Sequence, residues 1–198
     1  WRRDDYVGET INIIDGVRAP SNSAGANGKA TKYFFFGGST TWGTGVNDKN
    51  TYPSIFAKLT GSDVTNFGET GYIARQSLAY LNNHVINHSL LDMSDVSVVF
   101  YDGVNDVNYR CRSEINGLGT GRENQIQNML IGEKRFSFMK TFAQLKDFMN
   151  IVFRRFIHID TSDLYNCASN ENRALEVAKS LVDTWEISAD LIESRGGQ

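Results

Sequence analysis

An apolar run that ends in two glycines constrains the fold of this chain more than any other feature. Residues Tyr33 to Phe36 are aromatic, and Gly37, Gly38 and Ser39 follow them directly. A short apolar run bounded by glycines is typical of a buried strand, and glycine lets the backbone turn sharply at its end. Open α/β sheets bind their ligands at the carboxyl ends of strands. Ser39 is therefore the candidate nucleophile, although a plain Gly-Gly-Ser-Thr-Thr turn is the alternative.

Two later junctions carry residues that suit the same chemistry. A second apolar run, 96–101, leads into the segment 102–106, and the segment 66–71 lies between the two runs. Ester hydrolysis through a serine needs a nucleophile and hydrogen-bond donors aimed at the developing oxyanion. Ser39, the backbone N–H of Gly71 and the side-chain amide of Asn105 would supply these groups.

The order of these segments resembles the SGNH hydrolases, also called GDSL-type esterases and lipases. Residues 37–43 are similar to the first sequence block of that family, 66–71 to the second, and 103–106 to its Gly-x-Asn-Asp block. The resemblance covers the first two thirds of the chain. It implies a three-layer, doubly wound parallel sheet of the flavodoxin-like type. It also implies that Ser39 is the nucleophile, and that the Ser39 N–H, the Gly71 N–H and Asn105 Nδ2 form the oxyanion hole.

The sequence departs from the family in two places. Gly38 stands where the first block usually has Asp, and no Asp-x-x-His follows Asn105 to supply a general base and its orienting carboxylate. We therefore expect the base and its carboxylate to lie outside this chain. His158 is the fallback base, because Asp160 would share its face of a strand. His84 and His88 are spaced like a metal pair on a helix, but a solvated helix face is the favoured interpretation, and no metal or cofactor is expected.

The last third of the sequence predicts a long helix and a further strand beyond it. Apolar residues recur at intervals of three and four from Leu175 to Ile192, and Gly196 and Gly197 are typical of a helix stop. A doubly wound fold would next add another strand. We therefore expect the native polypeptide to continue past Gln198. The fold of these 198 residues would then be incomplete at its carboxyl end, and a C-terminal remainder of the same polypeptide could be a partner.

The chain is expected to hold an extended entry segment, 1–31, and one α/β domain, 32–198. Strands are predicted at about 32–37, 63–67 and 96–101, and they alternate with helices at 52–59, 75–91 and 138–153, which favours a parallel sheet. Periodicity is lost over about 107–135. A loop of this length next to Asn105 is interpreted as a cover over the substrate, with plain disorder as the alternative.

Composition excludes two classes of partner. A net charge of −3 provides no electrostatic footprint for nucleic acid, and no apolar run is long enough to span a membrane. Cys111 and Cys167 could pair in an exported protein or stay free in the cytosol. An extracytoplasmic or cell-envelope location is favoured over a cytoplasmic one. Trp42 is expected to pack beneath the nucleophile loop, with a place in a sugar-binding cleft as the alternative.

These patterns predict a serine ester hydrolase that removes a small acyl group, such as acetyl, from a carbohydrate or similar substrate. One alternative is a carbohydrate-binding or scaffold module that keeps the fold without catalysis. The other is a nucleotide- or phosphate-binding domain that uses residues 37–45 as an anion cradle. The second lacks the Gly-Lys-Ser/Thr ending of phosphate-binding loops.

Overall fold

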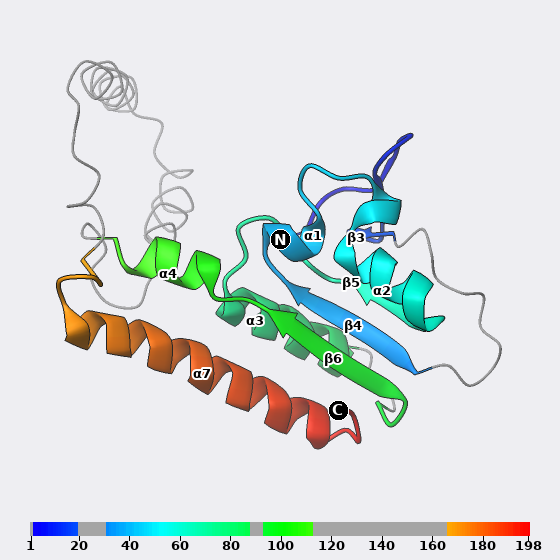
Figure 1. Ribbon diagram of the computed structural model, residues 1–198. Coiled ribbons are helices and arrows are strands. Elements are labelled where there is room, and N and C mark those ends of the chain that lie inside the picture. Colours follow the sequence, from blue (N-terminus) through cyan, green and yellow to red (C-terminus); the bar gives the residue numbers. More distant parts are fainter. Residues whose placement is uncertain (1, 20–30, 88–92, 113–165) are drawn as a thin grey trace, which may run out of the picture. The chain divides into compact units, whose positions relative to one another are not determined.

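The computed structural model describes residues 2–19, 31–87, 93–112 and 166–198 (Figure 1). The chain divides into two compact units, one formed by residues 1–107 with 178–198 and the other by residues 108–177. The first unit contains the sheet. The predicted helix at 138–153 and most of the predicted loop at 107–135 lie outside the described residues.

The described sheet has six strands and is mixed. Its order is β1-β2-β3-β5-β4-β6. β4 (Lys32–Gly37) pairs in parallel with β5 (Asp63–Asn66) on one side and β6 (Val96–Tyr101) on the other. These are the three strands that the sequence predicted, and their parallel pairing is confirmed.

The antiparallel part of the sheet was not predicted. It consists of β1 (Tyr6–Val7), β2 (Asn12–Ile14) and β3 (Val17–Arg18), which lie in the expected entry segment. Strands of two or three residues are too short for an alternation of apolar and polar residues to show. These strands join the sheet because β3 pairs with the edge of β5, where Arg18 lies opposite Asn66.

The described helices are α1 (Ser39–Trp42), the 3₁₀ helix η1 (Asp48–Asn50), α2 (Tyr52–Thr60), α3 (Ala74–Asn87), α4 (Val104–Arg110) and α7 (Glu171–Glu193). The N-cap of α2 is Thr51, whose Oγ1 accepts the Ser54 N–H at 3.3 Å, and Pro53 lies in its first turn as predicted. α4 differs from the prediction, because the helix continues to Arg110 where a loop was expected from Val107. A helix of only seven residues shows too little periodicity to be recognised in sequence.

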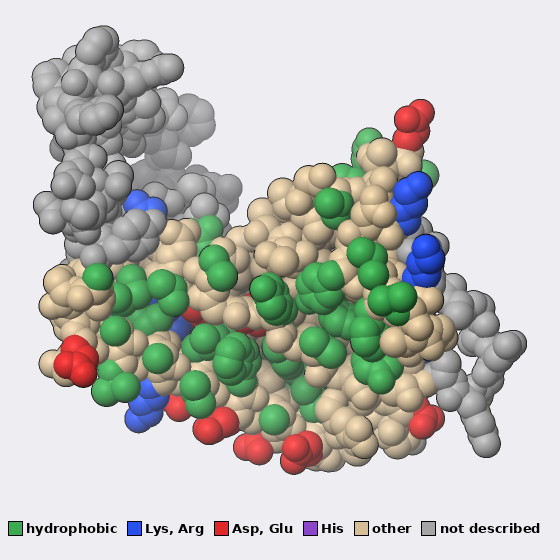
Figure 2. Space-filling model, in the orientation of Figure 1, with side chains coloured by type: hydrophobic (Ala, Val, Ile, Leu, Met, Phe, Trp, Pro, Cys, Tyr) green, Lys and Arg blue, Asp and Glu red, His purple; other side chains and the backbone are tan. Residues whose placement is uncertain are grey.

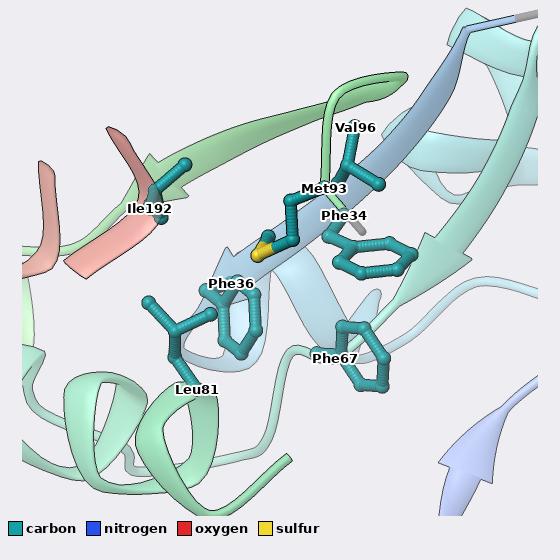
Figure 3. Packing of buried hydrophobic residues seen from close by; sticks show 7 residues of the cluster. All are labelled: Phe34, Phe36, Phe67, Leu81, Met93, Val96 and Ile192. Atoms are coloured by element: carbon teal, nitrogen blue, oxygen red, sulfur yellow. The ribbon is translucent and has the colours of Figure 1, made fainter. Parts of the chain in front are cut away.

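Alternate side chains of β4 point to opposite faces of the sheet and build two apolar clusters. Phe34 and Phe36 pack against residues of the loop after β5, α3, β6 and α7 on one face, as Figure 3 shows. Phe35 packs with Ala57 of α2 and Val64 on the other face. The Phe36 ring stacks on Phe67 and on Phe100, with centroid separations of 5.0 and 5.3 Å. The aromatic run therefore gives β4 apolar contacts on both of its faces, with residues of α3 and α7 on one and of α2 on the other.

The end of the described chain lies beside β6. α7 ends at Glu193, close to the predicted glycine stop, where Gly196 adopts a φ of +82°. The Gln198 N–H donates to Val96 O at 3.0 Å, and Val98 N–H donates to Gln198 O at 2.7 Å. This is how a residue of a parallel strand pairs with its neighbour. Figure 2 shows apolar side chains gathered over the region that β6 and α7 occupy in Figure 1.

The second unit is tied together by a disulfide between Cys111 and Cys167. Next to it, the Arg173 guanidinium donates to Arg110 O from Nε at 2.9 Å and from Nη2 at 2.6 Å. Asn166 N–H also donates to Cys111 O. The cysteines, for which the sequence left both states open, are therefore paired.

Candidate active site

Ser39 is the first residue of α1 and lies directly after the carboxyl end of β4. The turn between strand and helix depends on Gly37, which has a φ of +154°. A Cβ at Gly37 would collide with Thr41 Oγ1 and with Tyr101 O, so that no larger residue fits there. The serine is half-buried, and no described residue hydrogen bonds to its hydroxyl.

Arg18 holds the carboxyl end of α1 in place. Its side chain is 1% exposed, and its Nη1 donates to Trp42 O and to Gly43 O, both at 2.7 Å. Its Nε donates to Asp48 Oδ1 at 2.8 Å, which compensates the buried charge. An arginine at these carbonyls satisfies groups that a helix end leaves without partners. Sequence reasoning missed Arg18, because the contact joins residues 24 positions apart.

Trp42, the last residue of α1, is buried. Its side chain is 4% exposed, and the guanidinium carbon of Arg3 lies 4.4 Å from the centroid of its ring. A cation at this distance from an indole face is stabilising. The predicted packing role of Trp42 is confirmed, and the alternative place in a sugar-binding cleft is wrong for this buried ring.

The loop after β5 lies against α1. Asn66 Nδ2 donates to Thr41 O at 2.8 Å, and a Cβ at Gly68 would stand 2.5 Å from Trp42 N. Glu69 N–H donates to Gly37 O at 2.9 Å, so the loop continues the pairing of β5 with β4. Asn66 and Gly68, which the sequence identified only as members of a block, therefore both serve the contact between this loop and α1.

Glu69 and its partners stabilise the turn that contains Gly71. The Glu69 carboxylate is buried, and its Oε1 accepts from Arg3 Nε at 2.9 Å and from Thr70 N–H at 2.8 Å. Tyr72 N–H donates back to Glu69 O at 3.1 Å. Gly71 has a φ of +79°, a conformation that glycine adopts without strain.

Asn105 lies in the first turn of α4, after the carboxyl end of β6. Its Nδ2 donates to Tyr72 O at 2.7 Å, which fixes the orientation of the amide. A Cβ added to Gly38 would stand 2.5 Å from the same Nδ2. Glycine at position 38, the departure from the resembled family, is therefore the residue that leaves room for the Asn105 amide as it is placed here.

Ser39 and Asn105 line one cavity of about 180 Å³. Gly38, Tyr72 and Asp102 are also among its lining residues. Gly71 does not line the cavity but directly precedes Tyr72, which does. The structure therefore brings together two of the three predicted site residues and places the third next to them.

Asp102 lines this cavity and was not singled out in the sequence. Burial and, to a lesser extent, the nearby Asp106 carboxylate together raise the pKa of its carboxyl to about 7, against the opposing effect of a hydrogen bond from Ser77. Ser77 Oγ donates to Asp102 Oδ1 at 3.3 Å, and no described residue hydrogen bonds to the buried Oδ2. Asp106 Oδ2 accepts the Ala74 N–H, at the first residue of α3. The only sequence signal was the position of Asp102 directly after a predicted strand.

A second, more open hollow of about 330 Å³ lies on another side of Ser39. It shares Ser39 and Thr40 with the first cavity and is otherwise lined by different residues, among them Thr44, Asn50 and Tyr52. Tyr52 OH is hydrogen bonded to Thr41 Oγ1 at 3.0 Å, and burial raises the pKa of this phenol to about 12. The hydroxyl is therefore neutral under all ordinary conditions.

None of the three histidine side chains belongs to the described part of the chain. His88 and the fallback base His158 lie outside the described residues, and His84 is placed only by its backbone in α3. The described residues contain no group of three or more histidine, cysteine or acidic side chains that could hold a metal ion. Within the same residues, no helix is both long and apolar enough to cross a membrane.

No family model matches the chain, and no curated protein matches it. Among solved structures, the chain is similar to a proposed lipolytic protein of the G-D-S-L family from Desulfitobacterium hafniense DCB-2. The two are 14% identical, and the match covers 68% of this chain and 83% of the other, with a TM-score of 0.35.

Proposed function

We propose that this chain is a serine ester hydrolase of the SGNH type with Ser39 as nucleophile. The observation that carries the proposal is that Ser39 and Asn105 line one cavity at the carboxyl ends of β4 and β6. Ligand sites of α/β sheets occur at this edge. The three sequence blocks that resemble the SGNH hydrolases supply these residues, in the order that the family has.

The proposed reaction begins when Ser39 Oγ attacks the acyl carbon of the ester. The oxyanion that forms would accept hydrogen bonds from the Ser39 N–H, the Gly71 N–H and Asn105 Nδ2. The bond between Asn105 Nδ2 and Tyr72 O supports this role, because it uses one amide hydrogen and orients the other. A donor held in advance requires no reorganisation when charge develops.

A serine hydroxyl is a weak nucleophile without a base. By the resemblance, the base is the histidine of an Asp-x-x-His segment, and we propose that it lies outside these 198 residues. His158 remains the fallback within the chain.

The proposed substrate is a small acyl ester, such as an acetyl ester, of a carbohydrate. A cavity of about 180 Å³ supports a small acyl group, since larger ligands occupy pockets of roughly 300 Å³ or more. The disulfide between Cys111 and Cys167 supports an extracytoplasmic or cell-envelope location, because disulfides persist in oxidising compartments.

The test is covalent labelling combined with turnover. The natively expressed protein is treated with a fluorophosphonate probe and mapped by mass spectrometry, and acetate release from an acetylated sugar is measured. We expect an adduct on Ser39 and acetate release, both of which Ser39→Ala abolishes. Sugar binding without an adduct and without turnover would instead support the non-catalytic carbohydrate-binding module.

A further inference from the structure

The hollow on the second side of Ser39 has a lining chemistry that differs from that of the first cavity. Its exposed polar residues are Thr40, Thr44 and Asn50, and none of its lining residues carries a charge. The first cavity, in contrast, contains the Asp102 carboxyl. Two hollows that meet at one serine suggest that a bound molecule extends to both sides of it.

The geometry of an ester divides these two spaces between its two halves. The acyl carbon must contact Ser39 Oγ, and the carbonyl oxygen must face Asn105, which lines only the smaller cavity. The acyl and alcohol substituents of that carbon point in different directions. The smaller cavity holds the carbonyl and a short acyl group, which leaves the hollow of about 330 Å³ for the alcohol.

The side chains of this hollow match a neutral alcohol with several hydroxyl groups. Asn50 offers an amide donor and acceptor. Thr44 is exposed, and its hydroxyl, which has one long contact of 3.5 Å to Thr70 Oγ1, retains capacity for a further hydrogen bond.

Tyr52, whose hydroxyl is hydrogen bonded to Thr41, is partly exposed and lines the hollow. Its ring packs against Phe35 and Tyr101, which holds one aromatic surface in place at the hollow. Sugars present hydroxyl edges and apolar C–H faces, and a site of hydroxyls, an amide and one aromatic ring suits both.

We propose that this hollow is the alcohol subsite, that it binds a neutral sugar residue, and that Asn50 and Thr44 determine specificity for it. The proposal rests on the proposed ester hydrolysis at Ser39 and adds which half of the substrate lies on which side. Alcohols with a charged group are not expected to bind here, because the lining residues offer no opposite charge.

The test uses the natively expressed protein and compares two acetate esters that differ only in the alcohol. One is a mono-O-acetylated methyl hexopyranoside, and the other is 4-nitrophenyl acetate. For Asn50→Ala, we expect the ratio of kcat/KM for the sugar ester to kcat/KM for the phenyl ester to fall about tenfold, the effect of one lost hydrogen bond. Thr44→Val should lower the same ratio. The control is Asn83→Ala, which makes the same change at an exposed position of α3 that lines neither hollow and should keep the ratio.

A second measurement separates this inference from the proposed function. Binding of the unacetylated methyl hexopyranoside to Ser39→Ala is followed by NMR titration, with and without Asn50→Ala. If the wild type hydrolyses both esters and Asn50→Ala leaves the ratio unchanged, the subsite is wrong while the hydrolase stands. If neither ester is hydrolysed, but the glycoside binds and Asn50→Ala weakens it, the hollow is a sugar site and the hydrolase is wrong. An absence of both turnover and binding overturns both.

Discussion

At the scale of single residues, contacts between distant parts of the chain account for the geometry around Ser39. The Asn105 amide is oriented by Tyr72 O, 33 residues away in sequence, and it lies where a side chain at position 38 would stand. Gly38 and Asn105 therefore constrain one another.

Replacing Asn105 tests its role as an oxyanion donor. Asn105→Ala is expected to lower kcat for acetate esters by about 10²–10³, the usual cost of one oxyanion donor. The loss should appear in kcat more than in KM, because the charge develops only in the transition state. Steady-state kinetics with circular dichroism as a fold control measures it. Activity within a few-fold of wild type would contradict the assigned role.

Replacing Asp102 tests the electrostatics of the same cavity. Its pKa is raised from 3.8 to about 7 in the folded protein, so between these values the folded state binds more protons than the unfolded state. The free energy of unfolding must therefore contain a part that falls as pH rises through this window and is constant above it. Asp102→Asn removes this part, and its stability relative to wild type should increase from pH 4.5 to pH 8.

Urea unfolding of both proteins at a series of pH values measures the difference. Ser77→Ala serves as the matched control, because it removes the hydrogen bond to Asp102 and keeps the carboxyl. It should raise the pKa of Asp102 and so extend the window in which stability falls. Stability curves for Asp102→Asn and wild type that run parallel from pH 4.5 to pH 8 would disprove the raised pKa.

At the scale of elements, periodicity and length decide what a sequence reveals. The strands β4, β5 and β6 and the helices α2, α3 and α7 were predicted, because each has an apolar run or stripe long enough to recognise. The short strands β1 to β3 and the helix α4 were not. The short strands form because neighbouring strands offer them backbone partners, as β5 does for β3 at Asn66. The helix α4 has too few residues for its periodicity to show in the sequence.

Hydrogen exchange tests the pairing of Gln198 with β6. Lys32 N–H donates to Asp95 O, so the backbone N–H and C=O groups of the odd-numbered residues of β6 point toward β4. The N–H groups of Val98 and Phe100 therefore both point away from β4. Of these two, Val98 donates to Gln198 O, and Phe100 has no such partner among the described residues. We expect the Val98 amide to exchange at least about tenfold more slowly than that of Phe100.

Shortening the 198-residue chain to residues 1–197 should make the two exchange rates similar, because it removes the acceptor for Val98. Gln198→Ala is the control: it keeps the backbone carbonyl and should retain the protection. Equal exchange of Val98 and Phe100 in the intact chain would show that Gln198 does not pair with the edge of β6.

At the scale of the whole molecule, segments far apart in sequence complete each unit. Residues 178–198 join residues 1–107 in one unit, and the disulfide joins Cys111 to Cys167 across 56 residues in the other. Removing this link should destabilise the second unit by about 2–4 kcal/mol, because the unfolded chain gains conformational freedom. The change in urea midpoint for Cys111→Ser, under non-reducing conditions, measures the effect.

Cys167→Ser and the double variant should show the same loss as Cys111→Ser, since any one of the changes removes the link. Addition of a reductant to wild type should reproduce it. Unchanged unfolding of all three variants would mean that the cysteines are not paired in the folded protein.

The sequence by itself determined the three parallel strands, the helices between them and the positions of Ser39 and Asn105 after strand ends. It could do so because these features depend on local periodicity and on glycines next to apolar runs. Only the tertiary structure decided that Gly38 makes room for the Asn105 amide, that Arg18 holds α1, and that Asp102 titrates near neutral pH. Each of these depends on atoms brought close by folding, and burial and contact across dozens of residues leave no periodic signal in the chain.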